Sequence, residues 1–145
     1  MEVLDMGCGS GILSIAALLL GAKSCTGVDI DENSVRIARE NAELNNINQD
    51  RFTVYLGDVT EDKALQEKIG YNKYDMIEVN IIAQVIMSMS YTFPKFLKKG
   101  GLVIASGIIK KYLQEVTDNF ENLGFEIIEI NESEEWVSVT AKLPS

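Results

Sequence analysis

Short runs of β-branched and apolar residues alternate with longer segments of helical periodicity along the chain. This alternation is typical of α/β proteins with a mainly parallel sheet, because a parallel strand returns through a helical crossover. The pattern predicts strands at residues 2–6, 24–29, 52–57, 74–79, 102–106, 125–130 and 136–142. It predicts helices at residues 10–20, 32–45, 61–69, 83–97 and 112–123, the fourth of them kinked or shortened by Pro94.

The last two predicted strands are separated only by residues 131–135. A parallel crossover needs about a dozen residues or more, so these two strands must pair antiparallel. The sequence therefore predicts a doubly wound α/β fold with a seven-stranded, mostly parallel sheet and one antiparallel strand near the C-terminus. Trp136 lies in the final strand, where an aromatic side chain is most often part of the core, and lining of a substrate pocket is the alternative role.

Composition places the chain among single-domain globular proteins. Its 145 residues suffice for one domain, and apolar residues make up 46% of the chain against 24% for charged residues. The longest apolar run, residues 15–20, is far shorter than the roughly 20 residues of a membrane span. The two cysteines, Cys8 and Cys25, show no metal-ligand spacing, which favours reduced thiols and a cytoplasmic location.

Charge restricts both the partners and the chemistry. The formal net charge of −9 opposes binding to a nucleic-acid backbone, because that affinity depends on Lys and Arg. A cationic ligand or a basic protein is the expected partner, and we expect neither direct nucleic-acid binding nor membrane binding. The chain has no histidine, which removes the usual general base and the commonest metal ligand.

Three glycines, Gly7, Gly9 and Gly11, occupy the turn between the first predicted strand and the first predicted helix. Without Cβ atoms, such a turn lets main-chain amides approach a ligand closely. Asp29 follows about 20 residues later at the tip of the second predicted strand, as in nucleotide-binding α/β folds. The sequence therefore predicts a nucleotide-cofactor site at this edge of the sheet.

The charges near this turn discriminate between two cofactors. Asp5, Asp29, Asp31 and Asp58 lie at or near the predicted site, and the turn has no Lys or Arg. Carboxylates repel the pyrophosphate of NAD, whereas S-adenosylmethionine has a sulfonium and an ammonium group against one carboxylate. Ile12 also stands where the dinucleotide fingerprint requires Gly or Ala. Both observations favour S-adenosylmethionine over NAD.

Residues 5–11, 27–31 and 57–59 resemble three motifs of the class I S-adenosylmethionine-dependent methyltransferases, which have a Rossmann-like fold. The resemblance implies that Gly7 and Gly9 approach the methionine moiety and that Asp5 lies near its ammonium group. It implies that Asp29 binds the ribose hydroxyls and that Asp58 binds the adenine amino group, although capping of the next helix is an alternative role for Asp58. The predicted cofactor-binding residues are Asp5, Gly7, Cys8, Gly9, Gly11, Asp29, Ile30, Asp58, Val59 and Asn80.

A closer resemblance covers essentially the whole chain. Residues 3–16, 39–42, 80–83, 99–101, 106–108 and 135–137 are similar to the bacterial methyltransferases of large-subunit ribosomal protein eleven. The most discriminating segment is Asn80-Ile81-Ile82-Ala83, where other amino-methylating enzymes have Asn or Asp followed by two prolines and an aromatic residue. The resemblance implies N-methylation of lysine side chains and of the N-terminal amine of a basic ribosomal protein.

Asn80 is the predicted catalytic residue, because its amide oxygen can accept a hydrogen bond from the amine and orient it. Capping of the helix that begins near Ala83 is the alternative role. Methyl transfer from a sulfonium to a neutral amine needs alignment rather than a strong base, so the absence of histidine is compatible with it. We do not expect a metal ion to take part.

Two alternatives stay open at this point: an RNA or small-molecule amine methyltransferase on the same fold, and a cofactor-binding fragment that is inactive alone. The family has an N-terminal substrate-recognition domain and a segment that covers the methionine end of the cofactor, and neither is recognisable in residues 1–145. We therefore expect these residues to form the S-adenosylmethionine-binding methyltransferase domain. Weak activity alone and self-association through an uncovered face of the sheet are the expected consequences.

Overall fold

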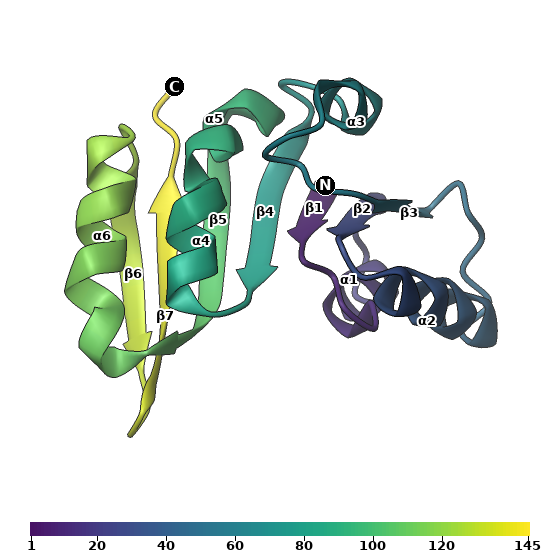
Figure 1. Cartoon of the computed structure of the whole chain (residues 1–145), viewed down its shortest axis with the longest axis horizontal. Coiled ribbons are helices and arrows are strands. Elements are labelled where there is room, and N and C mark those ends of the chain that lie inside the picture. The colour runs from purple at the N-terminus through teal and green to yellow at the C-terminus, as the bar shows by residue number, and fades with distance from the viewer.

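Seven strands form one sheet in the computed structural model, which describes residues 1–145. The strands are β1 (Glu2–Met6), β2 (Ser24–Asp29), β3 (Phe52–Leu56), β4 (Tyr74–Asn80), β5 (Leu97–Ile109), β6 (Glu126–Glu132) and β7 (Trp136–Lys142). Their order in the sheet is β3-β2-β1-β4-β5-β7-β6, and β7 pairs antiparallel with both of its neighbours while all other pairs are parallel. The prediction of a mostly parallel sheet with one reversed strand is confirmed (Figure 1).

Helices pack on both faces of this sheet, with one group near the β3 edge and another near the β6 edge. The helices are α1 (Ile12–Leu19), α2 (Glu32–Leu44), α3 (Lys63–Ile69), α4 (Ala83–Met89), α5 (Phe93–Phe96) and α6 (Leu113–Asn122), with short 3-10 turns η1 (Ser90–Thr92) and η2 (Lys110–Tyr112). Helices α1 and α2 pack near β1, β2 and β3, whereas α4, α5 and α6 pack on β5, β6 and β7 (Figure 1). None of the helices has the length and hydrophobicity that a membrane span requires.

Alternation along the strands divides the core into two clusters. Leu4 and Met6 of β1 belong to the larger cluster, under α3, α4, α5 and α6, whereas Val3 belongs to the smaller cluster under α1 and α2. Successive side chains of a strand point to opposite faces, so this division follows directly from the strand pattern. A sheet covered in this way leaves its functional groups at the ends of the strands.

Most predicted elements agree with the observed bounds within two residues, but the fourth predicted helix is divided. The Thr92 hydroxyl donates to the Met89 carbonyl at 2.7 Å, inside the 3-10 turn that separates α4 from α5. Pro94 lies in the first turn of α5, where its missing N–H leaves no hydrogen bond unmade. Pro94 therefore begins a helix rather than kinking one.

Strand β5 is longer than predicted and irregular at both ends. It begins at Leu97, which pairs with Tyr74, and its register with β7 shifts between Ala105 and Ile108. The residues in this second irregularity, 106–107, form a β-bulge at the carboxyl end of the strand. β5 extends through residues 98–101, two lysines and two glycines, which the hydrophobic pattern alone assigns to a turn. The Gly100 amide donates to the Leu143 carbonyl at 2.7 Å, and the Gly101 carbonyl accepts the Leu143 amide at 2.8 Å.

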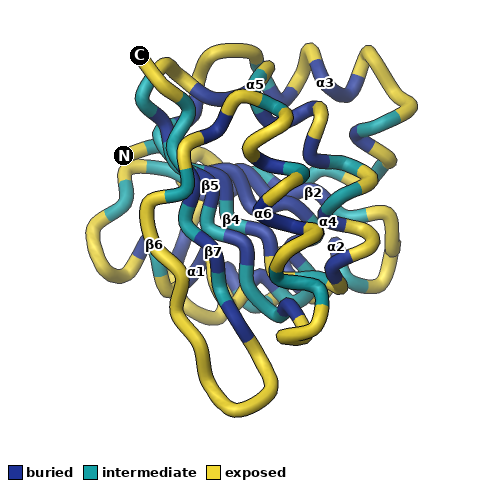
Figure 2. The backbone as a smooth tube through the Cα atoms, turned by 90° about the vertical axis from the view of Figure 1, so that its left-hand side faces the viewer, coloured by how far each residue is buried: buried dark blue, intermediate teal, exposed yellow.

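The hairpin between β6 and β7 extends beyond the body of the protein, and its tip is exposed (Figure 2). Because β6 runs parallel to β4 and β5, this tip lies at the carboxyl edge of the sheet. Trp136 is the first residue of β7, and its side chain is 51% exposed. The expectation that Trp136 belongs to the core is therefore wrong, because the strand begins beyond the helices that cover the sheet.

Candidate active site

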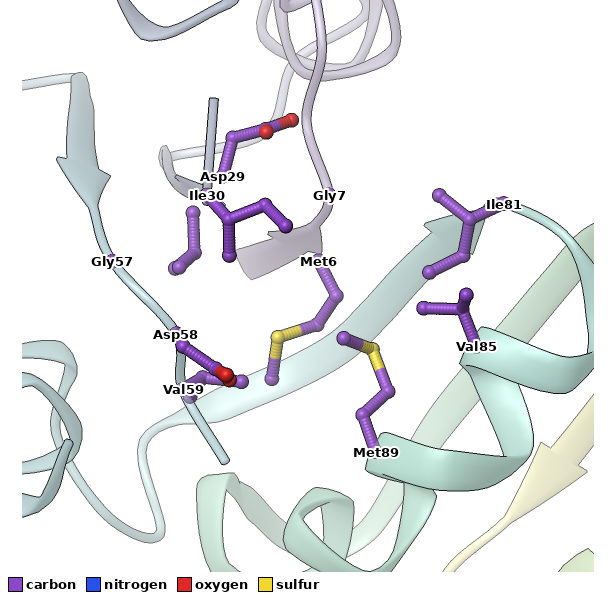
Figure 3. A pocket seen from close by; sticks show the side chains of 11 residues that line it. Met6, Gly7, Asp29, Ile30, Gly57, Asp58, Val59, Ile81, Val85 and Met89 are labelled. Atoms are coloured by element: carbon purple, nitrogen blue, oxygen red, sulfur yellow. The ribbon is translucent and has the colours of Figure 1, made fainter. Parts of the chain in front are cut away.

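A pocket opens at the carboxyl ends of β1, β2 and β4 and at the loop that follows β3 (Figure 3). The chain leaves β1 toward α1 on one face and leaves the adjacent β4 toward α4 on the other face. Ligands bind at such switch points in open α/β sheets. The pocket is lined by Met6, Gly7, Val28, Asp29, Ile30, Gly57, Asp58, Val59, Ile81, Val85 and Met89.

The glycine turn between β1 and α1 is held against the end of β2. The Gly7 amide donates to the Val28 carbonyl at 2.8 Å, and the Gly9 amide donates to Oδ2 of Asp29 at 2.9 Å. Gly7 has a φ of 70°, and an added Cβ would lie 3.1 Å from the Ile81 side chain. Glycine is therefore needed here for the left-handed conformation and for the close approach of the turn to the pocket wall.

Two other residues of the turn, Cys8 and Gly11, face the core rather than the pocket. An added Cβ on Gly11 would lie 3.1 Å from Phe52 and 3.2 Å from Ala38, so this glycine lets α1 approach α2. The Cys8 side chain is buried against Gly27. Burial raises the pKa of the Cys8 thiol to about 12, and neighbouring carboxylates add to the shift. Neither residue is among the pocket-lining residues.

Asp29 lines the pocket from the end of β2. Its Oδ2 atom accepts the Gly9 amide and its Oδ1 atom accepts the Asp31 amide, both at 2.9 Å. The carboxylate lies on the side of the pocket away from Asp58 (Figure 3). A carboxylate oxygen can accept two hydrogen bonds, so both oxygens retain capacity for the hydroxyl groups of a ligand.

Asp58 and Val59 line the opposite side, on the loop after β3. Oδ1 of Asp58 accepts hydrogen bonds from the Thr60 amide at 2.9 Å and from the Thr60 hydroxyl at 2.6 Å. The N-terminal cap of α3 is Asp62, whose carboxylate accepts the Leu65 amide at 3.0 Å. The alternative that Asp58 caps the next helix is therefore wrong.

Asp5 lies beneath the glycine turn and does not line the pocket. Its side chain is 1% exposed, and Oδ2 accepts the Ser14 hydroxyl at 2.7 Å. Burial raises the pKa of Asp5 to about 6 against the lowering effect of the Ser14 hydrogen bond, and the charge of Asp29 raises it further. Asp31 caps α2 by accepting the Asn33 amide at 3.1 Å. Only two of the four expected carboxylates therefore line the pocket.

Asn80 is exposed at the end of β4, beside the pocket. The residue that precedes α4 is Ile82, and no side chain caps this helix. The alternative that Asn80 caps the helix is therefore wrong. The next residue, Ile81, lines the pocket, whereas Oδ1 of Asn80 faces Gly107 of β5.

The apolar wall of the pocket was not predicted from the sequence. It consists mainly of Met6, Ile81, Val85 and Met89 (Figure 3). Val85 and Met89 are four residues apart on α4 and therefore lie on the same side of that helix. Their spacing and the position of Ile81 next to Asn80 are the sequence signals that could have identified this wall.

The pocket suits one end of a nucleoside-like ligand. It encloses about 170 Å³, less than the roughly 300–1,000 Å³ of pockets that enclose a whole drug-sized ligand. The lining combines apolar side chains with two carboxylates and has no basic residue. Such a lining accepts hydrogen bonds from hydroxyl or amino groups, favours cations, and disfavours phosphate groups.

Comparison with known proteins agrees with this geometry. A family model described as ribosomal protein L11 methyltransferase (PrmA) matches residues 1–144. A ribosomal protein L11 methyltransferase from Agathobacter rectalis is 46% identical over 140 residues, which are 97% of this chain and 43% of that protein. A protein of the same name from Acetivibrio thermocellus is 48% identical over 141 residues, which are 97% of this chain and 42% of that protein. The chain thus spans less than half the length of these relatives.

Solved structures confirm the Rossmann-like methyltransferase fold. A crystal structure described as ribosomal protein L11 methylase from Lactobacillus delbrueckii subsp. bulgaricus has a TM-score of 0.88 at 30% identity, covering 99% of this chain and 70% of that chain. An RNA methyltransferase from Salinibacter ruber, solved with S-adenosyl-L-homocysteine, has a TM-score of 0.73 at 17% identity and covers 99% of this chain and 81% of that chain. At this identity the likeness shows a shared fold alone. Since the family model matches nearly the whole sequence, the chain belongs to the ribosomal protein L11 methyltransferase family.

Proposed function

We propose that this chain binds S-adenosylmethionine in the pocket at the ends of β1, β2 and β4 and transfers the methyl group to amines of ribosomal protein L11. The observation that carries the proposal is the lining of this pocket, where Asp29 and Asp58 are combined with an apolar wall and no basic side chain, beside Asn80. The names of the relatives support the choice of protein substrate.

Each part of the pocket has an assigned partner on the cofactor. Asp29 would accept hydrogen bonds from the ribose hydroxyls with the acceptor capacity that the Gly9 and Asp31 amides leave. Asp58 would accept the adenine amino group, with Val59 and Ile30 packed against the base. Gly7 and Gly9 would border the methionine moiety, while the buried Asp5, Cys8 and Gly11 shape the turn from below.

When bound, S-adenosylmethionine would supply a methyl group: the lone pair of the amine forms the new N–C bond, and the electron pair of the broken C–S bond returns to sulfur. The ammonium product then gives a proton to solvent. The task of the protein is alignment and exclusion of water. Asn80 would orient the amine by accepting a hydrogen bond through its amide oxygen. No strong base is required, in agreement with a chain that has no histidine.

Two measurements test the proposal. Calorimetry should show binding of S-adenosylhomocysteine, and a tritiated-methyl assay should show transfer to purified ribosomal protein L11, with the full-length Acetivibrio thermocellus relative as positive control. Asn80→Ala should lower kcat by about tenfold or more while S-adenosylhomocysteine binding falls by less. Absence of cofactor binding would overturn the proposal. Binding without transfer would identify the chain as a cofactor-binding unit that is inactive alone.

The proposal also includes self-association of the chain. An apolar groove beside α1 is lined by Leu13, Leu20 and Met76 among others, and Leu20 is 89% exposed. Such a patch favours self-association, which sedimentation at increasing concentration would detect.

We place the reaction in the cytoplasm, because both cysteines are free thiols and the substrate is a ribosomal protein.

A further inference from the structure

Exposed lysines gather at the amino edge of the sheet, opposite the candidate active site. Residues 68–73 run from the end of α3 to β4, and residues 95–99 run from α5 into β5. Both helices lie at the end of the sheet where β4 starts (Figure 1). The two segments contain no carboxylate and five of the 13 basic residues of the chain, all exposed: Lys68, Lys73, Lys95, Lys98 and Lys99. We call these two segments the lysine lobe.

Main-chain hydrogen bonds hold the two segments of the lysine lobe together. The amides of residues 72–73 donate to the carbonyls of residues 95–96, and both distances are 2.9 Å. Nζ of Lys98 pairs with Oδ1 of Asp75 at 3.3 Å, whereas the other four lysines form no salt bridge. The lobe therefore exposes four cations without a carboxylate partner on a framework that the main chain fixes.

An exposed aromatic ring lies within the lysine lobe. Tyr71 is 44% exposed, and its ring stacks on Phe96 with 5.9 Å between the ring centroids and 10° between the ring planes. Phe96 is fully buried, and the Tyr71 hydroxyl donates to Oε1 of Gln66 at 3.2 Å. The Tyr71 ring is thus held in place before any ligand arrives. A ring that is already ordered loses little conformational entropy when a planar group stacks on it.

The net charge of −9 does not exclude a polyanion at the lysine lobe. β4 has seven residues at about 3.3 Å each, so the carboxylates at the opposite edge of the sheet lie about 20 Å away. Because the Debye length is about 10 Å at 0.1 M salt, these carboxylates are largely screened at the lobe. The expectation that excluded nucleic acids used the charge of the whole chain, whereas binding depends on the charges within contact distance.

We propose that the lysine lobe binds a single-stranded nucleic acid, with its phosphates on the lysines and one base stacked on Tyr71. Lysines neutralise backbone phosphates, and every base has a face that stacks on an aromatic ring. This combination favours a single strand over a duplex, whose bases are already stacked on each other, and over an acidic protein, which offers carboxylates without bases. The lobe and the candidate active site lie at opposite edges of the sheet, so the bound strand is not the methyl acceptor. The inference does not depend on the proposed function.

Fluorescence anisotropy with a labelled oligoadenylate RNA of about eight nucleotides tests the charges of the lobe. Above about 0.1 M salt, log affinity should fall against log salt with a slope of about −2 to −3, because each phosphate contact of a single strand contributes about −0.7. Lys73→Gln combined with Lys95→Gln should weaken binding about tenfold and reduce the slope by about 1.4.

The matched control is Lys110→Gln combined with Lys111→Gln in η2, at the other edge of the sheet. It removes the same charge, and Nζ of Lys111 lies over the Tyr112 ring as Nζ of Lys95 lies over the Tyr91 ring. The control should change the affinity by less than about twofold, since neither lysine belongs to the lobe. No binding by the wild-type chain, or equal losses in the two double variants, would overturn the inference.

Tyr71 separates a nucleic acid from other polyanions. Tyr71→Ala should weaken RNA binding about fivefold with an unchanged salt slope, because it removes stacking and no charge, and Tyr71→Phe should restore most of the loss. Polyglutamate of similar length should not compete. An unchanged affinity in Tyr71→Ala, or competition by polyglutamate at equal concentration, would overturn the assignment to nucleic acid. S-adenosylhomocysteine affinity should be the same in all these variants, so that failure of this inference leaves the proposed function standing.

Discussion

Asp5 and Glu78 are direct neighbours in the parallel register of β1 and β4. Oε2 of Glu78 is buried without a hydrogen-bond partner. Burial raises the pKa of Glu78 to about 7, and the charge of Asp5 adds to the shift. Burial likewise raises the pKa of Asp5 to about 6. Both carboxyl groups therefore hold a proton more tightly in the folded protein than in the unfolded chain.

This pair predicts a protein that loses stability as the pH rises. Between the unfolded pKa of Glu78, 4.5, and its folded pKa of about 7, the folded chain binds more protons than the unfolded chain, so the free energy of unfolding falls with increasing pH. Glu78→Gln removes this term and should raise Tm by about 3–6 °C near pH 8. The difference should shrink toward about pH 4, where the wild-type carboxyl group is protonated in both states.

Thermal unfolding followed by circular dichroism checks this prediction across the pH range. Glu129→Gln is the matched control, because it removes the same charge from the exposed side of β6. A Tm difference between Glu78→Gln and wild type that does not vary with pH would contradict the assignment of the effect to proton binding.

Asp29 should be needed for cofactor affinity. Asp29→Ala removes the proposed ribose contact and the support of the Gly9 amide, so binding of S-adenosylhomocysteine should weaken by on the order of 1.5–3 kcal/mol. The control is Asp31→Ala, which removes an equal charge two residues away but caps α2 and does not line the pocket. Calorimetry should show the control within about twofold of wild type. Equal losses in both variants would exclude a specific role for Asp29.

Gly107 should act as a positioning residue for Asn80. A Cβ in Gly107→Ala would displace the Asn80 amide, and the φ of 74° adds strain. We expect kcat for methyl transfer to fall by about tenfold, with S-adenosylhomocysteine affinity within about threefold of wild type. Gly124→Ala introduces similar strain at a φ of 95° but meets no atom within 4 Å, so it should lower Tm without changing kcat. A similar kcat in both variants would reduce Gly107 to a structural role.

The pocket should reject NAD. Its two carboxylates and lack of basic residues repel a pyrophosphate group, whereas they attract a sulfonium. At concentrations where S-adenosylhomocysteine raises Tm measurably, NAD should give no shift. A comparable shift from NAD would contradict the assignment of the cofactor.

The hydrophobic pattern predicted the sheet well, because buried parallel strands have short apolar runs and an antiparallel strand such as β7 alternates between buried and less buried residues. Residues 2–6, 24–29 and 136–142 coincide with β1, β2 and β7. The extension of β5 was not predictable in this way, because residues 98–101 are lysines and glycines, and Gly100 and Gly101 are held by main-chain hydrogen bonds with Leu143. The exposure of Trp136 depends on how far the β6–β7 hairpin extends beyond α6, which no local pattern encodes.

In the candidate site, too, the residues placed by the local sequence pattern were predictable, and those placed by packing between elements were not. Gly7, Asp29 and Asp58 follow strands at fixed positions, so the sequence places them at one edge of the sheet, and all three line the pocket. The position of Asp5 beneath the turn was not predictable, because it depends on the docking of Ser14 from α1. The wall formed by Val85 and Met89 likewise depends on how α4 packs across the strand ends.

The two buried thiols make the opening of the glycine turn measurable. Cys8 is 8% exposed and Cys25 is 2% exposed, and burial raises the pKa of each to about 12. Because the thiolate is the reactive form, alkylation of the folded protein has to proceed through molecules in which α1 has transiently moved away from the sheet. The labelling rate under native conditions therefore measures how often this half of the protein opens. A ligand that bridges the glycine turn and Asp29 would slow the labelling as its occupancy rises, without any need for turnover.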